Sequence, residues 1–282
     1  MGQLSVDTSN HVITGACADF ASKKDSQCLE KICDLTIANL HENHIEMNQL
    51  LADTAYSSGK TLKYLEAKGI NGWIPNFGQY KPEREGFLYN KELDRYECQR
   101  GHQAILPFKG IRKHHNEYEF KLYRSSESVC KNCPFRVECC GEKTKFKKID
   151  HSIHKDYYDR QHKKLTENKS YAQRMSRLRS STVEPVLGTL INYVNMKRIN
   201  TRGIALANKH VLMAALTYNL KKYLKFISKK VISQAVAMQI DVNAIFSACF
   251  SVLLIIFRSF HPLFLENENY KQKDNRSLER LF

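Results

Sequence analysis

The sequence is poor in acidic residues: 29 Asp and Glu stand against 44 Lys and Arg, a formal net charge of +15 in 282 residues. This shortage argues against a basic partner and favours a polyanion, because each phosphate that is neutralised releases a counterion. A merely soluble basic protein is the alternative. Hydrophobic residues still make up 42% of the chain, so a folded core is expected, in one large domain or two modest ones.

Long apolar runs are scarce as well. The first residues, 1–7, contain no basic stretch followed by an apolar run, so no secretory leader is predicted. The most apolar run, 244–257, has about two thirds of the length of a spanning helix and is followed by Arg258. We therefore expect a buried or partner-facing helix there and no membrane partner, a transmembrane span being the alternative. The expected compartment is a reducing cytoplasm.

The nine cysteines are an odd number, which argues against a secreted disulfide framework and, in a reducing compartment, favours a metal site. Cys130 and Cys133 form a C-x2-C knuckle, Cys139 follows closely, and Cys98 lies upstream. Four thiolates suit tetrahedral zinc, and a closed four-ligand site would be structural. The predicted zinc ligands are Cys98, Cys130, Cys133 and Cys139, with His102 and Cys140 as substitutes. Unmetallated reduced thiols are the alternative, and we expect core positions for Cys17, Cys28, Cys33 and Cys249.

Hydrophobic periodicity predicts an α/β arrangement in the first 75 residues. Two short apolar runs, residues 4–6 and 12–13, flank a polar turn and predict a hairpin. Asp25-Ser26 is expected to cap a helix. A buried strand at 49–53, a helix at 60–68 closed by Gly69, and a strand at 70–74 then indicate a parallel strand pair.

The rest of the chain divides into a basic insertion and a helical part. Residues 76–148 are basic, aromatic and cysteine-bearing, with β-like alternation at Tyr118, Phe120 and Leu122. Four helices are expected, over residues 155–168, 171–178, 183–196 and 207–227. The predicted domains are the first part of the core at 1–75, the insertion at 76–148, the second part of the core at 149–230 and a tail at 231–282.

Two acidic residues stand out by position. Asp53 lies at the carboxyl end of the predicted buried strand, where ligands of open α/β sheets gather, although a helix-capping role is equally open. Glu184 precedes Pro185, which is expected in the first turn of a helix, and an ordinary first-turn glutamate is its alternative. Carboxylates are the ligands that hard divalent cations prefer, but spacing alone cannot bring these two together.

Five segments carry a recognisable pattern: VDTSNHVIT, ADTAYSSG, CKNCPFRVECC, RSSTVEPVLGTLINYVNMKRINTRG and ANKHVLMAALTYNLKKYLKF. With these segments the chain resembles, over about residues 2–226, the insertion-sequence transposases of the DDE class, in the subgroup with cysteines between the second and third acidic residues. It implies an RNase H-like mixed sheet flanked by helices, with a small zinc-ribbon-like insertion. It also implies that Asp53 and Glu184 are the second and third acidic residues and that they hold Mg²⁺.

The resemblance further implies a bacterial cytoplasmic enzyme that cuts and joins DNA at transposon ends, as a homodimer on DNA. Basic residues near Glu184 would hold the DNA backbone, although each could equally be part of a solvated face. These are Arg177, Arg179, Lys197, Arg198 and Arg202.

The sequence departs from the family pattern at two positions. Many relatives have a lysine seven residues after the glutamate, and Ile191 stands there in this chain. The first acidic residue of the family lies on a strand upstream of the hairpin, so Asp7 is either that residue or a hairpin residue. In the second case the chain is truncated at its N-terminus and inactive alone. A non-catalytic zinc-containing DNA-binding remnant and a nuclease are the alternative functions.

Overall fold

A computed structural model describes residues 1–113, 118–235 and 249–252. Contacts divide the chain into Met1–Lys221 and Lys222–Phe282, and the elements below belong to the first unit except for the end of the last helix. Most of the apolar run 244–257 and of the predicted tail 231–282 lies outside the described residues. Within the described part, no helix is both long and apolar enough to cross a membrane.

The predicted hairpin is confirmed. Strands β1 (Gly2–Val6) and β2 (Ile13–Ala18) pair antiparallel, with a register irregularity between Ser5 and Val6. The connecting turn is organised by Asp7, whose Oδ2 accepts hydrogen bonds from the backbone N–H groups of Ser9, at 3.1 Å, and Asn10, at 2.6 Å. A short carboxylate that bonds its own backbone two or three residues on is typical of such a turn.

The outer edge of β2 is covered by two asparagines of α7 (Ile204–Ala235). The side-chain amide of Asn219 donates to the Ile13 carbonyl at 2.8 Å and accepts from the Ile13 N–H at 2.9 Å. Asn208 Oδ1 accepts from the Ala18 N–H at 2.8 Å. Because an unpaired buried backbone group costs about as much as a lost hydrogen bond, these amides take the place of a neighbouring strand.

Helix α1 (Asp25–His41) is confirmed, but its predicted cap is wrong. Lys24, not the Asp25-Ser26 pair, occupies the N-cap position, and its N–H donates to Gln27 Oε1 at 2.9 Å. Because the Gln27 side chain already accepts the hydrogen bond of the Lys24 N–H, the start of the helix does not require a capping side chain at position 25. Cys28 and Cys33 are buried on α1 and Cys17 is buried on β2, as expected for core cysteines, whereas Cys249, also expected in the core, is only half-buried.

The predicted strand–helix–strand unit is also confirmed. Strands β3 (Gln49–Leu51) and β4 (Asn71–Trp73) pair parallel and are connected by α2 (Gly59–Ala67). Gly69, just after the C-cap of α2, has a φ of +69°. The N-cap Ser58 accepts from the Thr61 N–H at 3.1 Å. A Cβ on Gly59 would lie 2.3 Å from Cβ of His154, so this end of α2 approaches the start of α5 (Lys155–Glu167) very closely.

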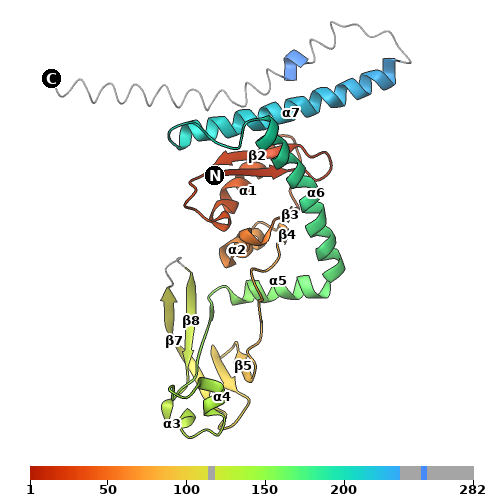
Figure 1. The fold of residues 1–282 in the computed structure, drawn as a ribbon. Helices are drawn as coiled ribbons and strands as arrows, with labels where there is room; N and C mark the ends of the chain where they lie inside the picture. Colours follow the sequence, from red (N-terminus) through yellow and green to blue (C-terminus); the bar gives the residue numbers. More distant parts are fainter. Residues whose placement is uncertain (114–117, 236–248, 253–282) are drawn as a thin grey trace, which may run out of the picture. The chain divides into compact units, whose positions relative to one another are not determined.

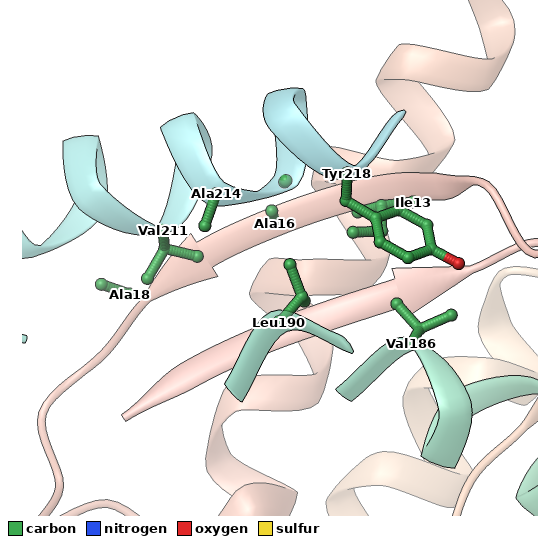
Figure 2. Close-up of a cluster of buried hydrophobic side chains, with 9 residues drawn as sticks. Ile13, Ala16, Ala18, Val186, Leu190, Val211, Ala214 and Tyr218 are labelled. Carbon is green, nitrogen blue, oxygen red and sulfur yellow. The ribbon is translucent and has the colours of Figure 1, made fainter. Parts of the chain in front are cut away.

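The expectation of one mixed sheet is met only in part. The structure is mixed α/β, but β1–β2 and β3–β4 form two separate two-stranded sheets. Helix α6 (Lys169–Tyr193) contacts both: Gln49 Nε2 lies 3.4 Å from the Tyr171 hydroxyl, and Val186 and Leu190 pack against the hairpin and α7. Figure 2 shows these two side chains directed towards the hairpin, with residues of α7 in the same cluster.

The predicted break between two helices at 178–183 is wrong. Helix α6 continues through this stretch, with Pro185 in its interior. Proline lacks the N–H that would bond the Ser181 carbonyl, but residues 181 and 185 are both exposed, so water can satisfy that carbonyl. No glycine interrupts 170–187, and one missing hydrogen bond does not end a helix that is anchored at both ends by buried residues.

The insertion forms a five-stranded antiparallel sheet in the order β5-β6-β7-β8-β9. Figure 1 labels β5, β7 and β8 of this sheet, with α3 and α4 beside it. Its strands are β5 (Phe87–Asn90), β6 (Arg95–Cys98), β7 (Ile105–Lys113), β8 (Glu119–Arg124) and β9 (Lys148–Ser152). Two short helices, α3 (Glu127–Cys130) and α4 (Arg136–Cys140), connect β8 with β9. The predicted alternation at Tyr118, Phe120 and Leu122 thus belongs to β8 or its start, and the sheet continues to Ser152.

The interior of this sheet is a hydrogen-bonded polar cluster. The hydroxyls of Tyr89 and Tyr123 both donate to Asp94 Oδ1 at 2.6 Å, and Lys121 Nζ donates to Asp94 Oδ2 at 2.9 Å. His151 lies within hydrogen-bond distance of the Tyr96 hydroxyl, 2.8 Å from Nδ1. Burial lowers the pKa of His151 to about 4, so this imidazole is neutral near pH 7.

Candidate functional sites

Asp53 lies two residues after the end of β3 and forms the N-cap of the short helix η1 (Thr54–Tyr56). Its Oδ1 accepts from the Ala55 N–H at 2.9 Å. The carboxylate is half-buried at the carboxyl end of a parallel strand, which is the predicted position. The capping role and the position at the strand end therefore coexist, and one carboxylate oxygen is already engaged by the backbone.

Glu184 lies on the exposed side of α6. Its side chain is 64% exposed, and Oε1 is 3.5 Å from Arg179 Nη2. At 100° per residue, the buried residues of α6 share one side of the helix and Glu184 lies across from them. Those buried residues are Met175, Thr182, Val186 and Leu190.

In the described part of the chain, the carboxylates of Asp53 and Glu184 make no contact with each other. A hollow of about 420 Å³ beside Glu184 is lined by α6 alone, and Asp53 is not among its residues. These residues are Ser176, Arg177, Ser180, Ser181, Glu184 and Pro185. The two side chains have the right chemistry for a hard cation, but the shared metal site stays a prediction.

Asp7 has the role of a hairpin residue. Its Oδ2 is engaged by the two backbone N–H groups of the turn between β1 and β2. A carboxylate held in this way organises the turn, which favours the hairpin alternative over the role of first acidic ligand.

The predicted DNA-contacting residues lie on the outer surface of α6 and in the segment between α6 and α7. Arg177 is exposed beside the hollow, whereas Arg179 is more buried and bonds Ser180 Oγ at 3.0 Å as well as facing Glu184. Ile191 is 42% exposed on the same helix. The segment after α6 contains three exposed cations, Lys197, Arg198 and Arg202. Exposed cations suit phosphate contacts, and their role on DNA remains a prediction.

The cysteines of the insertion surround one cavity of about 460 Å³. Its lining includes all four predicted zinc ligands and both substitutes: Cys98, His102, Cys130, Cys133, Cys139 and Cys140. The cavity is formed by β6, α3, α4 and the segments around them, so cysteines up to 42 positions apart line it, as the difference between 140 and 98 shows.

Two local contacts hold the thiols of Cys98 and Cys133 near the turn at residues 100–101, where Cys98 Sγ also donates to the Arg100 carbonyl at 3.0 Å. The Arg100 N–H points at Cys98 Sγ, 3.4 Å away, and a Cβ on Gly101 would lie 2.5 Å from Cys133 Sγ. The glycine, with a φ of +54°, therefore allows the second thiol to approach the turn that holds the first. His102 Nδ1 is 3.1 Å from the Val129 carbonyl, and since a carbonyl only accepts, Nδ1 is the donor of this hydrogen bond.

The thiols are nevertheless not gathered around one point. Among the described residues, no three Cys, His, Asp or Glu side chains form a group that could hold a metal ion as they stand. Burial and the neighbouring Cys139 raise the pKa of Cys140 to about 11, which keeps that thiol protonated. The donor types and their common cavity fit zinc, whereas the sulfur positions do not yet fit a tetrahedral site.

Sequence reasoning missed the basic surface of β7. Lys109, Arg112 and Lys113 are all exposed on this strand, next to exposed Phe108 and Ile111. The alternation of residues 105–113 is irregular around Gly110, which hides the strand from a period-two pattern. The signal that could have revealed this surface is the presence of several basic residues within a run of residues that favour strands.

Residues 97–224 match the family model of the transposase DDE domain. The matched segment contains Glu184 and all the cysteines around the cavity but not Asp53. No curated protein and no solved structure matches the chain significantly.

Proposed function

We propose that this chain, which carries the transposase DDE domain over residues 97–224, is the catalytic region of an insertion-sequence transposase. Its substrate would be DNA at the ends of the element, and its chemistry strand cleavage followed by strand transfer. The family match supports the reaction class. The β3-α2-β4 unit, which presents Asp53 at a strand end, supports the position of one acidic ligand.

In this proposal Asp53 and Glu184 are the carboxylates that hold divalent cations, with Mg²⁺ the expected ion. Bound cations would stabilise the attacking and leaving oxygens of the phosphodiester. The protein's own contribution is to hold the DNA backbone through Arg177 and the cations that follow α6, without reading base identity. Arg179 would position Glu184, because the two side chains already form an ion pair.

We further propose that Asp7 is not the first acidic residue of the family pattern and that the chain alone binds DNA without cutting it. The turn uses Asp7 Oδ2, and that role supports this reading. A non-catalytic DNA-binding remnant would behave identically in a cleavage assay. Metal binding is therefore the measurement that distinguishes the two.

The test is Mn²⁺ binding, followed by the electron paramagnetic resonance signal of the free ion. We expect binding by the wild type, weakened at least about tenfold in both Asp53→Asn and Glu184→Gln, since each removes a charged oxygen ligand. Asp7→Asn is the matched control and should bind like the wild type. Wild-type binding that neither Asp53→Asn nor Glu184→Gln changes would contradict the proposed site, and no binding at all would favour the remnant.

A nuclease with the same core is the second enzymatic reading. It differs in its products, because hydrolysis leaves cleaved ends whereas a transposase joins a 3′-hydroxyl to target DNA. Should the purified chain cut DNA, joined products on a labelled target fragment support the transposase, and their absence supports the nuclease. Strand transfer abolished by Asp7→Ala would overturn the assignment of Asp7 to the turn.

We also propose that the cysteine-lined cavity holds a structural zinc ion, with Cys98, Cys130, Cys133 and Cys139 as ligands. The shared cavity and the N–H···S contact at Cys98 support this. Zinc would draw the thiolates together from their present positions. The test is the zinc content of protein purified without added metal: about one ion per chain is expected, lost in Cys130→Ser and Cys133→Ser, and unchanged in the control Cys17→Ala. Content near zero in the wild type would end the proposal.

A further inference from the structure

Asp53 lies in a short turn that is closed by its own hydrogen bonds. Asp53 Oδ1 accepts from the Ala55 N–H at 2.9 Å, and the Asp53 carbonyl accepts from the Tyr56 N–H at 3.2 Å. Residues 53 and 56 are thus the two ends of one hydrogen-bonded unit, which consists of η1 and its N-cap. A contact that fixes the Tyr56 side chain therefore also limits where the Asp53 carboxylate can lie.

The Tyr56 side chain is bonded to a buried amide on another element. Its hydroxyl donates to Gln3 Oε1 at 2.5 Å, and Gln3 Nε2 donates to Asp25 Oδ1 at 3.1 Å, at the start of α1. Gln3 lies on β1 and is only 2% exposed, so little water can compete for either bond. Burial, followed by the nearby carboxylates of Asp25 and Asp53, raises the pKa of Tyr56, which keeps the phenol protonated as the donor.

This link joins two elements that no strand pairing joins. Gln3 belongs to the β1–β2 hairpin and Tyr56 follows β3, and these two strands lie in separate two-stranded sheets. The Tyr56 ring also packs against an apolar cluster that includes Leu29 of α1. Apolar packing has no preferred direction, so the directional part of this contact is the hydrogen bond from Tyr56 to Gln3.

The hairpin is also the element on which the helix of Glu184 packs. Val186 and Leu190, the buried residues that follow Glu184 on α6, pack against the hairpin. The contact of α6 with β3 at Tyr171 lies about 20 Å from Glu184 along the helix axis. The hairpin therefore contacts both the turn that contains Asp53 and the part of α6 that contains Glu184.

We infer that Tyr56 and Gln3 are positioning residues for Asp53. Their hydrogen bond sets the Asp53 carboxylate against the hairpin on which the helix of Glu184 packs. Neither side chain touches DNA or a cation in this role. The inference rests on the proposed function, because it assigns to these two residues the placement of a carboxylate that is proposed to hold a divalent cation.

The test is the Mn²⁺ titration of Tyr56→Phe, a variant that removes the hydroxyl and keeps the packing of the ring. We expect binding about tenfold weaker than in the wild type, as is typical when a group that orients a metal ligand is removed. The matched control is Tyr64→Phe on α2, which removes a hydroxyl that donates to Asp34 Oδ1 at 2.7 Å, outside this link. The control should bind Mn²⁺ like the wild type, and urea unfolding checks that both variants are folded.

A double-mutant cycle separates positioning from a general loss of structure. If Tyr56 acts through Asp53, Tyr56→Phe should weaken Mn²⁺ binding no further in the Asp53→Asn background, whereas independent effects would multiply. Gln3→Met, which keeps the approximate length of the side chain and removes the amide, should weaken binding about as much as Tyr56→Phe.

The outcomes separate this inference from the proposed function. If the wild type binds no Mn²⁺, or if Asp53→Asn binds it as the wild type does, the proposed function fails together with the inference. If Asp53→Asn weakens binding and Tyr56→Phe does not, the inference alone is overturned. Equal weakening in Tyr56→Phe and Tyr64→Phe, or effects that multiply in the cycle, would also overturn it, because both results indicate a general loss of structure.

Discussion

The α/β region and the five-stranded sheet satisfy their buried polar groups in different ways. In the first, mainly aliphatic side chains fill the interior between the hairpin, α6 and α7, and the backbone of β2 is bonded by Asn208 and Asn219. In the second, Tyr96, Tyr123 and His151 fill the interior and bond one another around Asp94. The stability of the first region depends on apolar packing, and the stability of the second depends on the protonation state of His151. Truncation of a side chain should therefore destabilise the first region, and acid should destabilise the second.

Truncating the apolar interior should have the largest effect. Leu190 is fully buried between the hairpin and α7, so Leu190→Ala should lower the free energy of unfolding by about 3 kcal/mol through lost burial and the cavity it leaves. Urea unfolding measures this. Leu187→Ala on the exposed side of α6 is the control, with an expected loss below about 1 kcal/mol. Equal losses in the two variants would show that the hairpin does not pack on this side of α6.

Acid should act on the sheet. The pKa of His151 is lowered by burial to about 4 from 6.5, so its contribution is fully present above pH 6.5 and is lost as the pH falls towards 4. The full loss corresponds to about 3 kcal/mol. The free energy of unfolding of wild type and His151→Gln should therefore converge between pH 7 and pH 4.5. A difference that stays constant over this range would mean that His151 does not change its protonation on unfolding.

Removing the edge amide should have a moderate effect. Asn219→Ala leaves the N–H and carbonyl of Ile13 without their side-chain partner, which should cost about 2 kcal/mol. The opening free energy that amide hydrogen exchange reports at Ile13 should fall by about the same amount. Exchange at Tyr123 in the five-stranded sheet should stay as in the wild type. Unchanged exchange at Ile13 would show that water satisfies this edge.

The smallest expected effect is a gain. Pro185→Ala restores the hydrogen bond to the Ser181 carbonyl in the middle of α6, and we expect a stabilisation of about 1 kcal/mol, because the proline is exposed and the missing bond is already open to water. Thermal unfolding measures it. A lower melting temperature would mean that α6 needs a kink at this position.

Local sequence patterns were sufficient to predict the elements whose structure depends mainly on their own residues. The hairpin, α1, the β3-α2-β4 unit and α5 follow from alternation, helical spacing and Gly69, and each is confirmed. The N-cap of α1 and the continuity of α6 were wrong, because neighbouring contacts outweigh a weak cap preference or a single proline. The pairing of distant residues, such as Asn219 with Ile13 or Cys98 with the later cysteines, depends on the tertiary fold and has no local signal.

The candidate sites show the same division. Spacing identified the cysteines that surround the cavity, and position identified Asp53 at a strand end. Spacing could not show that Glu184 lies on the exposed side of α6, since that depends on which face the hairpin and α7 cover. The exposed basic residues of β7 were missed because a bulge interrupts the alternation of this strand.

Gly59 sets how closely α2 can approach the start of α5. A methyl group at this buried position would overlap with the His154 side chain, so no larger residue fits between the two helix starts. The spacing of α2 and α5 therefore depends on the absence of a single side chain, and any replacement at position 59 would have to push one helix away from the other.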